Sequence, residues 1–346
     1  MTTDWFSKKL LHWYDSHQRD LPWRKTTNPY LIWLSEVILQ QTQVKQGLPY
    51  YNKFKERFET IQKLAAAKEE EVLRLWQGLG YYSRGRNLLS TAQHIVSTLD
   101  GIFPNSYEGL IKLKGIGPYT AAAIASFAFN EQVAVVDGNV FRVLSRVFGI
   151  YDDIQSVQGK KIFAALAQKL LPSKNTATYN QAIMEFGALQ CVPKNPQCTE
   201  CVFKTSCIAF QKQEMGLLPV KTKKIKAKDR YFHYFIFSYK NTIGMRLRED
   251  KDIWKGLYEF YLIEEKNKKP YTLLPTSIKK AKKRYEVKHV LSHQIIHACF
   301  WNIALETVLD KKKIVSEAGL TFYTLSEIKK LPKPILIAKC IETLII

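Results

Sequence analysis

The sequence predicts a chain of two parts, a mostly α-helical first half and a smaller α+β domain after it. Apolar residues recur at helical spacing through the first half, as in PYLIWLSEVILQQTQV and EEEVLRLWQGLG. VKTKKIKAKDR then carries six basic residues and one acidic residue, which is typical of an exposed linker. Aromatic-rich segments such as YFHYFIFSY follow and favour strands. We therefore expect a helical domain at 1–210, a basic linker at 211–228 and an α+β domain at 229–346.

The composition favours a polyanionic partner. The chain has 346 residues and a net charge of +21, from 52 Lys and Arg against 31 Asp and Glu. This balance suits nucleic acid, with a diffuse basic surface as the alternative. The first residues lack the apolar core of a secretory signal, and no stretch approaches a membrane span. We expect a cytoplasmic, nucleoid-associated protein in a reducing compartment.

The stretch LKGIGPYTAA predicts a tight turn between two helices. Gly115 and Gly117 can adopt positive φ at little cost, and Pro118 suits the first turn of the following helix. The free amides at such a helix start can hold an anion. A plain helix–helix corner is the alternative interpretation of these residues.

Four cysteines in seventeen residues predict a metal centre. Cys191, Cys198, Cys201 and Cys207 have the spacing C-x6-C-x2-C-x5-C. Zinc and iron–sulfur clusters both accept four thiolates. Only one pair is close, so the outer ligands must wrap around something larger, and the spacing favours a [4Fe–4S] cluster over zinc.

Two carboxyl groups have contrasting sequence environments. Glu36 lies among Ile32, Trp33 and Leu39 on a predicted helix, where burial raises a carboxyl pKa and suits a general acid. A glutamate whose carboxyl reaches out of the helix to solvent is the alternative. Asp137 precedes an amphipathic helix, where amide donors should hold it ionised, and it could be only an N-cap. Together the pair suits cleavage of a glycosidic bond.

These motifs together resemble the MutY adenine DNA glycosylases of the helix-hairpin-helix superfamily. DLPWR, WLSEVILQQTQV, GLGYYSRGRNL, LKGIGPYTAA, VVDGNVFRVL and the cysteine spacing all occur in the family's order. The resemblance implies removal of adenine mispaired with 8-oxoguanine or guanine in double-stranded DNA by a monomer. It makes the cysteines [4Fe–4S] ligands, and the hairpin with Gly115 and Gly117 a clamp for a DNA phosphate.

The resemblance also implies a role for each motif residue. Glu36 would protonate adenine N7, and Asp137 would stabilise the sugar cation with support from Tyr119 and Asn139. The adenine pocket would contain Arg19, Leu21, Trp23, Arg24 and Gln181. Gln41, with Thr42 beside it, and Tyr81 would enter the base stack around 8-oxoguanine while adenine is extruded.

The second half resembles the Nudix-like domain with which this family reads 8-oxoguanine. It lacks the acidic Nudix box, and its basic run IKKAKKRYEVKH has the wrong charge for Mg²⁺, so pyrophosphatase activity is not expected. The reading loop would be HVLSHQ, with Leu291, Ser292 and His293. Leu291 stands where many relatives carry Phe. An ordinary turn at a strand end is the alternative.

Two rival functions remain open at this point. The first is an endonuclease III-like bifunctional glycosylase/lyase, which carries a Schiff-base lysine where this chain has Tyr119. A phenol cannot form a Schiff base, so Tyr119 counts against this function. A non-catalytic iron–sulfur DNA-binding protein would have no use for the pair of Glu36 and Asp137.

Overall fold

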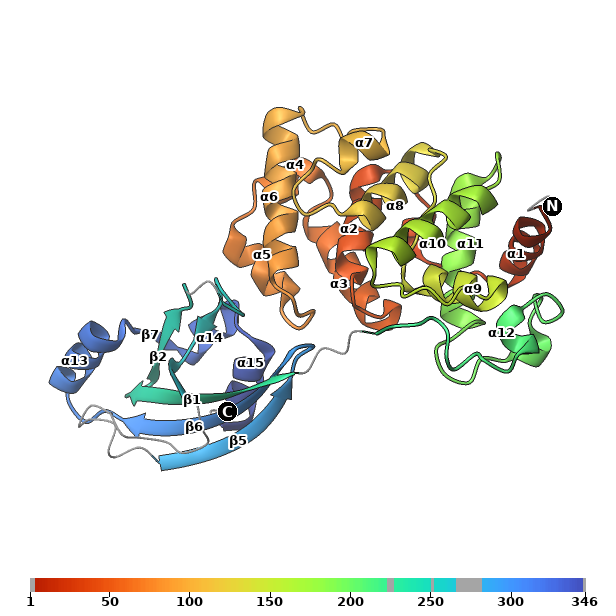
Figure 1. The fold of residues 1–346 in the computed structure, drawn as a ribbon. Coiled ribbons are helices and arrows are strands. Elements are labelled where there is room, and N and C mark those ends of the chain that lie inside the picture. The colour runs from red at the N-terminus through yellow and green to blue at the C-terminus, as the bar shows by residue number, and fades with distance from the viewer. Residues whose placement is uncertain (1–3, 223–226, 250–251, 266–281, 345–346) are drawn as a thin grey trace. The chain divides into compact units, whose positions relative to one another are not determined.

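The structure, a computed structural model, describes residues 4–222, 227–249, 252–265 and 282–344 in two compact units (Figure 1). One unit comprises residues 1–66 and 87–224, and the other comprises 67–86 and 225–346. The helical first half and the sheet-containing second half confirm the predicted fold class. The segment 67–86 belongs to the sheet-containing unit, whereas we expected the helical domain to contain all of residues 1–210.

Two parts of the basic segments lie outside the described residues. They are residues 223–226 of the expected linker and residues 278–281 at the start of the basic run. None of the helices in the described part of the chain is long and apolar enough to cross a bilayer.

The first unit is built from helices. Their bounds are α1 (Asp4–His17), η1 (Pro22–Arg24), α2 (Pro29–Leu39), α3 (Val44–Arg57), α4 (Ile61–Ala65), α7 (Tyr107–Leu110), α8 (Pro118–Phe129), α9 (Gly138–Phe148), α10 (Val157–Leu170), α11 (Thr176–Leu189), η2 (Cys198–Glu200) and α12 (Ile208–Gln211). Helix α6 (Ser83–Thr98) starts in the other unit and continues into this one.

Helix α2 begins where the sequence supplies a cap. The Asn28 side chain accepts hydrogen bonds from the amides of Tyr30 and Leu31, and Pro29 occupies the first helical position. Most of its side chains are buried, including that of Glu36. The helix thus carries a carboxyl group into the interior, because it packs against both α3 and α8.

Helix α8 follows the predicted hairpin. Gly115 has φ +81°, and the Thr91 hydroxyl donates to the carbonyl of Lys114, which fixes the turn. Pro118 then starts the helix, whose alanines are buried. The expected helix–hairpin–helix is therefore present at these residues.

Helices α9 and α11 approach closely because Gly187 has no side chain. A Cβ on Gly187 would stand 2.6 Å from the Cβ of Asn139. Real Cβ atoms essentially never come so close, so any other residue at 187 would push the two helices apart. The side chain of Asn139 is thereby held against the backbone of α11.

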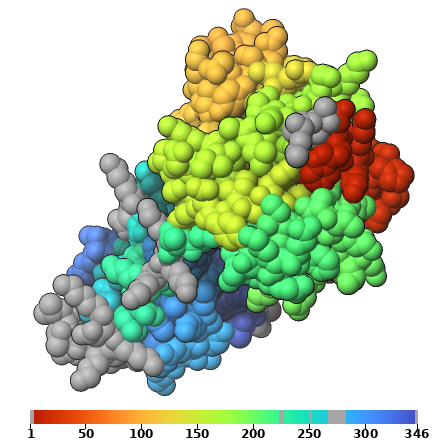
Figure 2. Space-filling model, turned by 45° about the vertical axis from the view of Figure 1, so that its right-hand side comes forward, coloured from red at the N-terminus to blue at the C-terminus, as the bar shows by residue number. Residues whose placement is uncertain are grey.

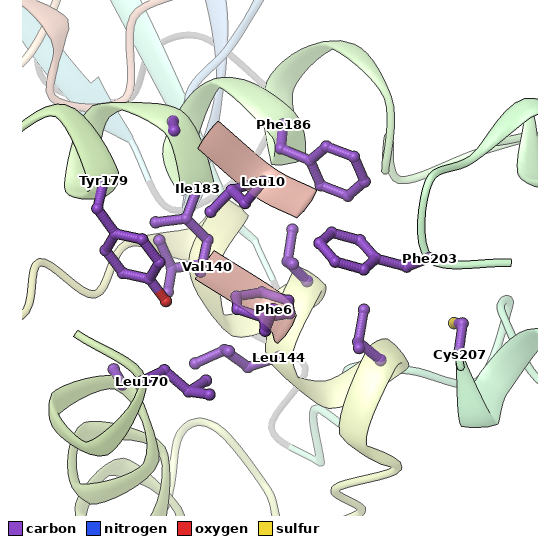
Figure 3. Packing of buried hydrophobic residues seen from close by; sticks show 14 of the residues in the cluster. Phe6, Leu10, Val140, Leu144, Leu170, Tyr179, Ile183, Phe186, Phe203 and Cys207 are labelled. Carbon is purple, nitrogen blue, oxygen red and sulfur yellow. The ribbon is translucent and has the colours of Figure 1, made fainter. Parts of the chain in front are cut away.

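The core of this unit also fixes the cysteine-bearing segment. Phe203 stacks on Phe6 with ring centroids 4.7 Å apart and meets Phe186 edge-on at 5.1 Å (Figure 3). The ring centroid of Trp5 lies 6.0 Å from that of Phe203. In Figure 2 the red surface of α1 lies against the green surface of the cysteine-bearing segment. Aromatic burial of this size anchors a loop that has little regular structure of its own.

Within its described residues, the second unit has a seven-stranded sheet and several helices. Its elements are α5 (Glu69–Trp76), β1 (Lys228–Tyr239), β2 (Thr242–Leu247), β3 (Tyr258–Glu259), β4 (Tyr261–Glu265), β5 (Lys282–Val290), β6 (Gln294–Ala304), α13 (Val308–Ala318), β7 (Thr321–Thr324), α14 (Leu325–Lys330) and α15 (Ile335–Leu344). The strand order is β3-β2-β1-β6-β5, with β4 paired to β1 and β7 paired to β2.

Strands β5 and β6 form an antiparallel hairpin, and β6 pairs in parallel with β1 along its length (Figure 1). The turn between them contains Leu291, Ser292 and His293. The amide of Leu291 donates to the carbonyl of Gln294, and the amide of Lys228 donates to the carbonyl of His293. The candidate reading loop is therefore a tight turn fastened at both ends to the sheet.

Candidate active site

A cavity of about 560 Å³ in the helical unit brings together all four predicted catalytic residues. Its walls come from α2, α8, α9, α11 and the segment around η1, which are far apart in the chain. The predicted residues that line it are Arg19, Leu21, Trp23, Arg24, Glu36, Thr42, Tyr119, Asp137, Asn139 and Gln181.

Glu36 is a buried carboxylic acid on this wall. Its side chain is buried, and the hydroxyl of Tyr119 donates to its Oε2 at 2.7 Å. Burial raises the pKa of Glu36 to about 7, although the Tyr119 hydrogen bond opposes the shift. The carboxyl is therefore partly protonated at neutral pH, as predicted, and can give a proton to a bound group.

Asp137 caps α9, but its electrostatics differ from the expectation. The carboxylate accepts from the amides of Asn139 and Val140, both at 2.8 Å, and from the Asn139 side-chain amide at 2.8 Å. Burial nevertheless raises the pKa of Asp137 above its usual value, and the donors only reduce the shift. The expected net shift toward the charged form was wrong in direction: the cap donors do lower the pKa, but burial, which is not visible in the local sequence, raises it by more.

Glu185 holds two arginines of the pocket and was missed by the sequence analysis. Arg19 donates to it at 2.8 and 2.5 Å, and Arg24 donates at 3.0 and 2.8 Å. Burial alone would raise the pKa of Glu185, but these bonds outweigh it and lower the pKa to about 2. Glu185 is therefore a fixed anion that sets the positions of both guanidinium groups.

Gln181 and Glu185 lie one helical turn apart on α11. The Tyr14 hydroxyl donates to Gln181 Oε1 at 3.1 Å, so both polar side chains on this face have partners. Glu185 stands in QAIMEFGALQ, a carboxyl on an otherwise apolar helix. The same signal singled out Glu36, and it could have identified Glu185.

Arg142 connects the catalytic side to the cysteine segment. Its guanidinium donates to Asn139 Oδ1 at 2.8 Å, to the carbonyl of Gly187 at 2.7 Å and to the carbonyl of Cys191 at 2.7 Å. A planar fork with several donors is needed for three such acceptors. One buried arginine thus orients Asn139 and fastens the chain at the first cysteine.

The four predicted ligand cysteines face one small pocket. Cys191, Cys198, Cys201 and Cys207 line it together with apolar side chains such as Val147 and Phe186. Arg146 Nη1 lies 3.5 Å from the sulfur of Cys191. Within the described ranges, no group of three or more His, Cys, Asp or Glu side chains is arranged to hold a metal ion.

The chemistry of these thiols suits a cationic group among them. Burial raises the pKa of Cys201 to about 11 and also raises the pKa of Cys198 and Cys207. Four thiolates in this pocket would repel one another unless a metal group neutralised them. The four cysteines share one pocket and their chemistry suits thiolate ligation, although their side chains are not arranged around a single ion in this structure.

The remaining predicted contacts lie elsewhere. Gly115 and Gly117 lie in the exposed turn before α8, and a Cβ on Gly117 would meet nothing within 4 Å. Gln41 is exposed with φ +55° and does not line the cavity.

Tyr81 belongs to the second unit, where it meets the turn between β5 and β6. Its hydroxyl shares a hydrogen bond with the Ser292 hydroxyl, and its ring centroid lies 6.4 Å from that of His293. These three residues and Leu291 line a cavity of about 490 Å³. The sequence named these residues, but it placed Tyr81 with the helical domain.

Comparisons with known proteins identify both parts of the chain. Residues 34–173 match the family described as HhH-GPD superfamily base excision DNA repair protein, and residues 233–343 match the NUDIX domain. The adenine DNA glycosylase of Buchnera aphidicola subsp. Baizongia pistaciae is 39% identical over 302 residues, covering 86% of this chain and 85% of its own. The human adenine DNA glycosylase is 45% identical over 222 residues, or 62% of this chain and 41% of its own.

Solved structures agree on the fold of the helical half. A thermostable thymine-DNA glycosylase matches with a TM-score of 0.57 and 27% identity, covering 61% of this chain and 97% of that one. A non-covalent endonuclease III–DNA complex matches with a TM-score of 0.53 and 22% identity, covering 62% and 98%. Because its identity is only 22%, the second match supports the fold and no statement about function.

Proposed function

The chain belongs to the adenine DNA glycosylase family, and on that premise we propose that it removes adenine paired with 8-oxoguanine or guanine. It is a base-excision-repair DNA glycosylase that hydrolyses an N-glycosidic bond. Its substrate is DNA, in keeping with the net charge of +21. Beyond family membership and a DNA substrate, the proposal is that the mispair is A:8-oxoguanine or A:G and that the enzyme acts as a monomer.

The observation that carries the chemistry is a buried carboxyl whose pKa is raised to about 7, next to a second, half-buried carboxyl whose pKa is also raised. Glu36 in its acid form protonates adenine N7, which makes the base a better leaving group. The carboxylate that remains can then accept a proton from the attacking water. General acid–base catalysis of this kind contributes roughly 10²–10⁴-fold.

Asp137 stabilises the developing sugar cation. Bond cleavage through an oxocarbenium-like transition state places positive charge on the sugar, which an ionised carboxylate attracts. Asn139 and the start of α9 hold Asp137 from one side, and the Tyr119 hydroxyl holds Glu36. Arg19 and Arg24, fixed by Glu185, with Leu21, Trp23 and Gln181, shape the pocket for the extruded base.

We expect glycosylase activity without efficient strand cleavage. Tyr119 occupies the position of a Schiff-base lysine and cannot form an imine. Of the described residues that line the cavity, Lys45 is the one lysine. Borohydride trapping on DNA with an A:8-oxoguanine pair checks this expectation. The adduct yield should be low, and any adduct should disappear in Lys45→Gln, whereas efficient trapping with strand nicking would favour the bifunctional reading.

The four cysteines would hold a [4Fe–4S] cluster. Four cysteines that line one pocket, with Arg146 beside Cys191, support this assignment. When bound, such a cluster supplies a cross-link that fastens the segment from Cys191 to Cys207. Purified protein should contain about four iron and four sulfide per chain. One zinc and no iron would overturn the assignment.

The damaged base would be read in the second unit. Ser292 and His293 offer exposed donors and acceptors, Leu291 offers an apolar contact, and Tyr81 offers a ring that can enter the stack. Gln41 and Thr42 would contact the stack from the helical unit, and the amides near Gly115 and Gly117 would bind a phosphate. Extruding adenine costs on the order of a few kcal/mol, and less at a mispair.

The test is single-turnover base release from duplexes in which adenine is paired with 8-oxoguanine, G, C or T. We expect release from the first two duplexes, with preference for 8-oxoguanine. Equal release from all four duplexes would contradict the proposed mispair specificity but not the glycosylase activity.

A further inference from the structure

The loop that presents Tyr81 has an unusual backbone. Gly78 has φ +104°, Gly80 has φ +74° and Tyr81 has φ +47°. Tyrosine has a Cβ and is disfavoured in this left-handed region, so neighbouring groups must hold it there. Its side chain is 39% exposed. The strain therefore serves to project an aromatic ring from the surface of its unit.

Hydrogen bonds from three side chains hold the loop. The Trp76 indole N–H donates to the carbonyl of Gly80 at 3.0 Å, and the amide of Gly78 donates to the Tyr82 hydroxyl at 3.4 Å. Arg84 Nη2 donates to the carbonyl of Leu79 at 3.1 Å and to that of Gly80 at 3.2 Å. Arg84 thus binds two successive carbonyls just before Tyr81.

The same guanidinium lies near two aromatic rings. Arg84 Cζ is 5.2 Å from the centroid of the Trp76 ring and 5.9 Å from that of Tyr81. Burial lowers the pKa of Arg84 to about 10, so it remains charged at neutral pH. A partly desolvated cation interacts more strongly with ring faces than an exposed one. The Tyr81 ring is therefore oriented by the group that also fixes its backbone.

We propose that Arg84 is a positioning residue for 8-oxoguanine recognition, which sets the backbone and ring of Tyr81 for entry into the base stack. This inference rests on the proposed function of Tyr81. It assigns selectivity to a residue that need not touch DNA. Lysine cannot replace it, since an ammonium group lacks the planar fork that binds adjacent carbonyls while lying along a ring.

The alternative role for Arg84 is a contact to a DNA phosphate. Its proximity to two rings, with hydrogen bonds to two carbonyls, argues against this role because the guanidinium is already engaged. The two roles differ in salt dependence. Loss of one phosphate contact reduces the slope of log K against log salt by about one, whereas loss of a positioning residue leaves the slope unchanged.

The experiment compares wild type, Arg84→Lys and a matched control, Arg57→Lys. Arg57 also lies over an aromatic ring, that of Phe58 at 5.4 Å, but it belongs to the helical unit and not to the unit that contains the loop. Affinity is measured on duplexes with a non-cleavable adenine analogue opposite 8-oxoguanine or G, over a salt series. Single-turnover release is measured with saturating enzyme, and peptide-resolved amide exchange at residues 77–82 is measured in free protein.

Arg84→Lys should lower the affinity preference for 8-oxoguanine over G roughly tenfold, as expected for two weakened hydrogen bonds. Its salt slope and its saturated release rate from A:8-oxoguanine should stay within twofold of wild type. Amide exchange at 77–82 should become faster. Arg57→Lys should change none of these quantities.

Several results would overturn the inference. They are an unchanged preference in Arg84→Lys, a slope reduced by about one, unchanged amide exchange in the loop, or a variant that does not fold. A wild type without preference for 8-oxoguanine would instead overturn the proposed substrate. In that case amide exchange still decides whether Arg84 holds the loop.

Discussion

The catalytic cavity of the helical unit and the reading loop of the sheet-containing unit solve opposite physical problems. The cavity wall buries Glu36 and Glu185 and half-buries Asp137, and burial shifts the pKa of Glu36 to about 7. The loop leaves Ser292 and His293 exposed on a turn fastened by main-chain hydrogen bonds. Proton transfer at neutral pH requires a desolvated acid, whereas reading a base requires donors that are open to it. Variants of each region should therefore fail in different measurements.

The largest expected effect is the loss of base release in Glu36→Gln. Glutamine keeps the shape and removes the transferable proton, so the single-turnover rate should fall at least about a hundredfold. Binding to the mispair should stay within about twofold. A wild-type rate in this variant would remove Glu36 from the mechanism.

Stability provides the control for this variant. The folded-state pKa of Glu36 is raised to about 7, so its ionised form opposes folding once the pH exceeds the unfolded value of about 4.5. Glu36→Gln should thus be more stable than wild type at pH 8, by up to about 3 kcal/mol. A lower melting temperature at pH 8 would mean that activity was lost through misfolding.

The second expected effect is the destabilisation of the helical unit by Glu185→Gln. The substitution leaves Arg19 and Arg24 without their buried anion. Breaking a buried pair costs about 3–5 kcal/mol, and the 35% exposure of the Arg19 side chain reduces this to about 2–3 kcal/mol. Urea unfolding at neutral pH measures it. The matched change Glu59→Gln, at an exposed pair with Lys63, should have little effect.

The third effect is a pH dependence of the release rate, which we expect to arise from the carboxyl groups of the cavity. Glu36 acts as an acid, so the rate at saturating enzyme should fall as pH rises through about 7, by tenfold per unit above it. Because the pKa of Asp137 is also raised, the acid side of the profile should start above the usual range of an aspartate. In contrast, the affinity of Glu36→Gln for the mispair should not show this fall as pH rises through about 7. A flat rate between pH 6 and 9 would contradict the role of Glu36.

The smallest effect is expected from the reading loop. Replacing both Ser292 and His293 with Ala should reduce the preference for A:8-oxoguanine over A:G by roughly tenfold, since one base contact is worth about 1–3 kcal/mol. The release rate from bound substrate should not change. Relative affinity on the two duplexes measures the effect. An unchanged preference would mean that Gln41 and Tyr81, and not Ser292 and His293, recognise 8-oxoguanine.

Local sequence determined the elements and the donor sets. Helical periodicity and capping residues such as Asn28 set the helix starts, and Gly115 with Pro118 set the hairpin. The four cysteines lie close in the chain, so their convergence followed from spacing. Glu36 was identifiable because a carboxyl on an apolar helix is buried in any packing that buries the helix.

Tertiary structure decided what depends on contacts between distant segments. Glu185 meets Arg19 across 166 residues, and no local pattern encodes that pairing. The pKa of Asp137 is raised because burial by other helices outweighs the local cap that sequence alone reveals. Residues 67–86 join the sheet-containing unit, which brings Tyr81 to Ser292 across 211 residues. Desolvation and long-range ion pairing depend on what surrounds a group in space, whereas capping and periodicity depend only on its neighbours in the chain.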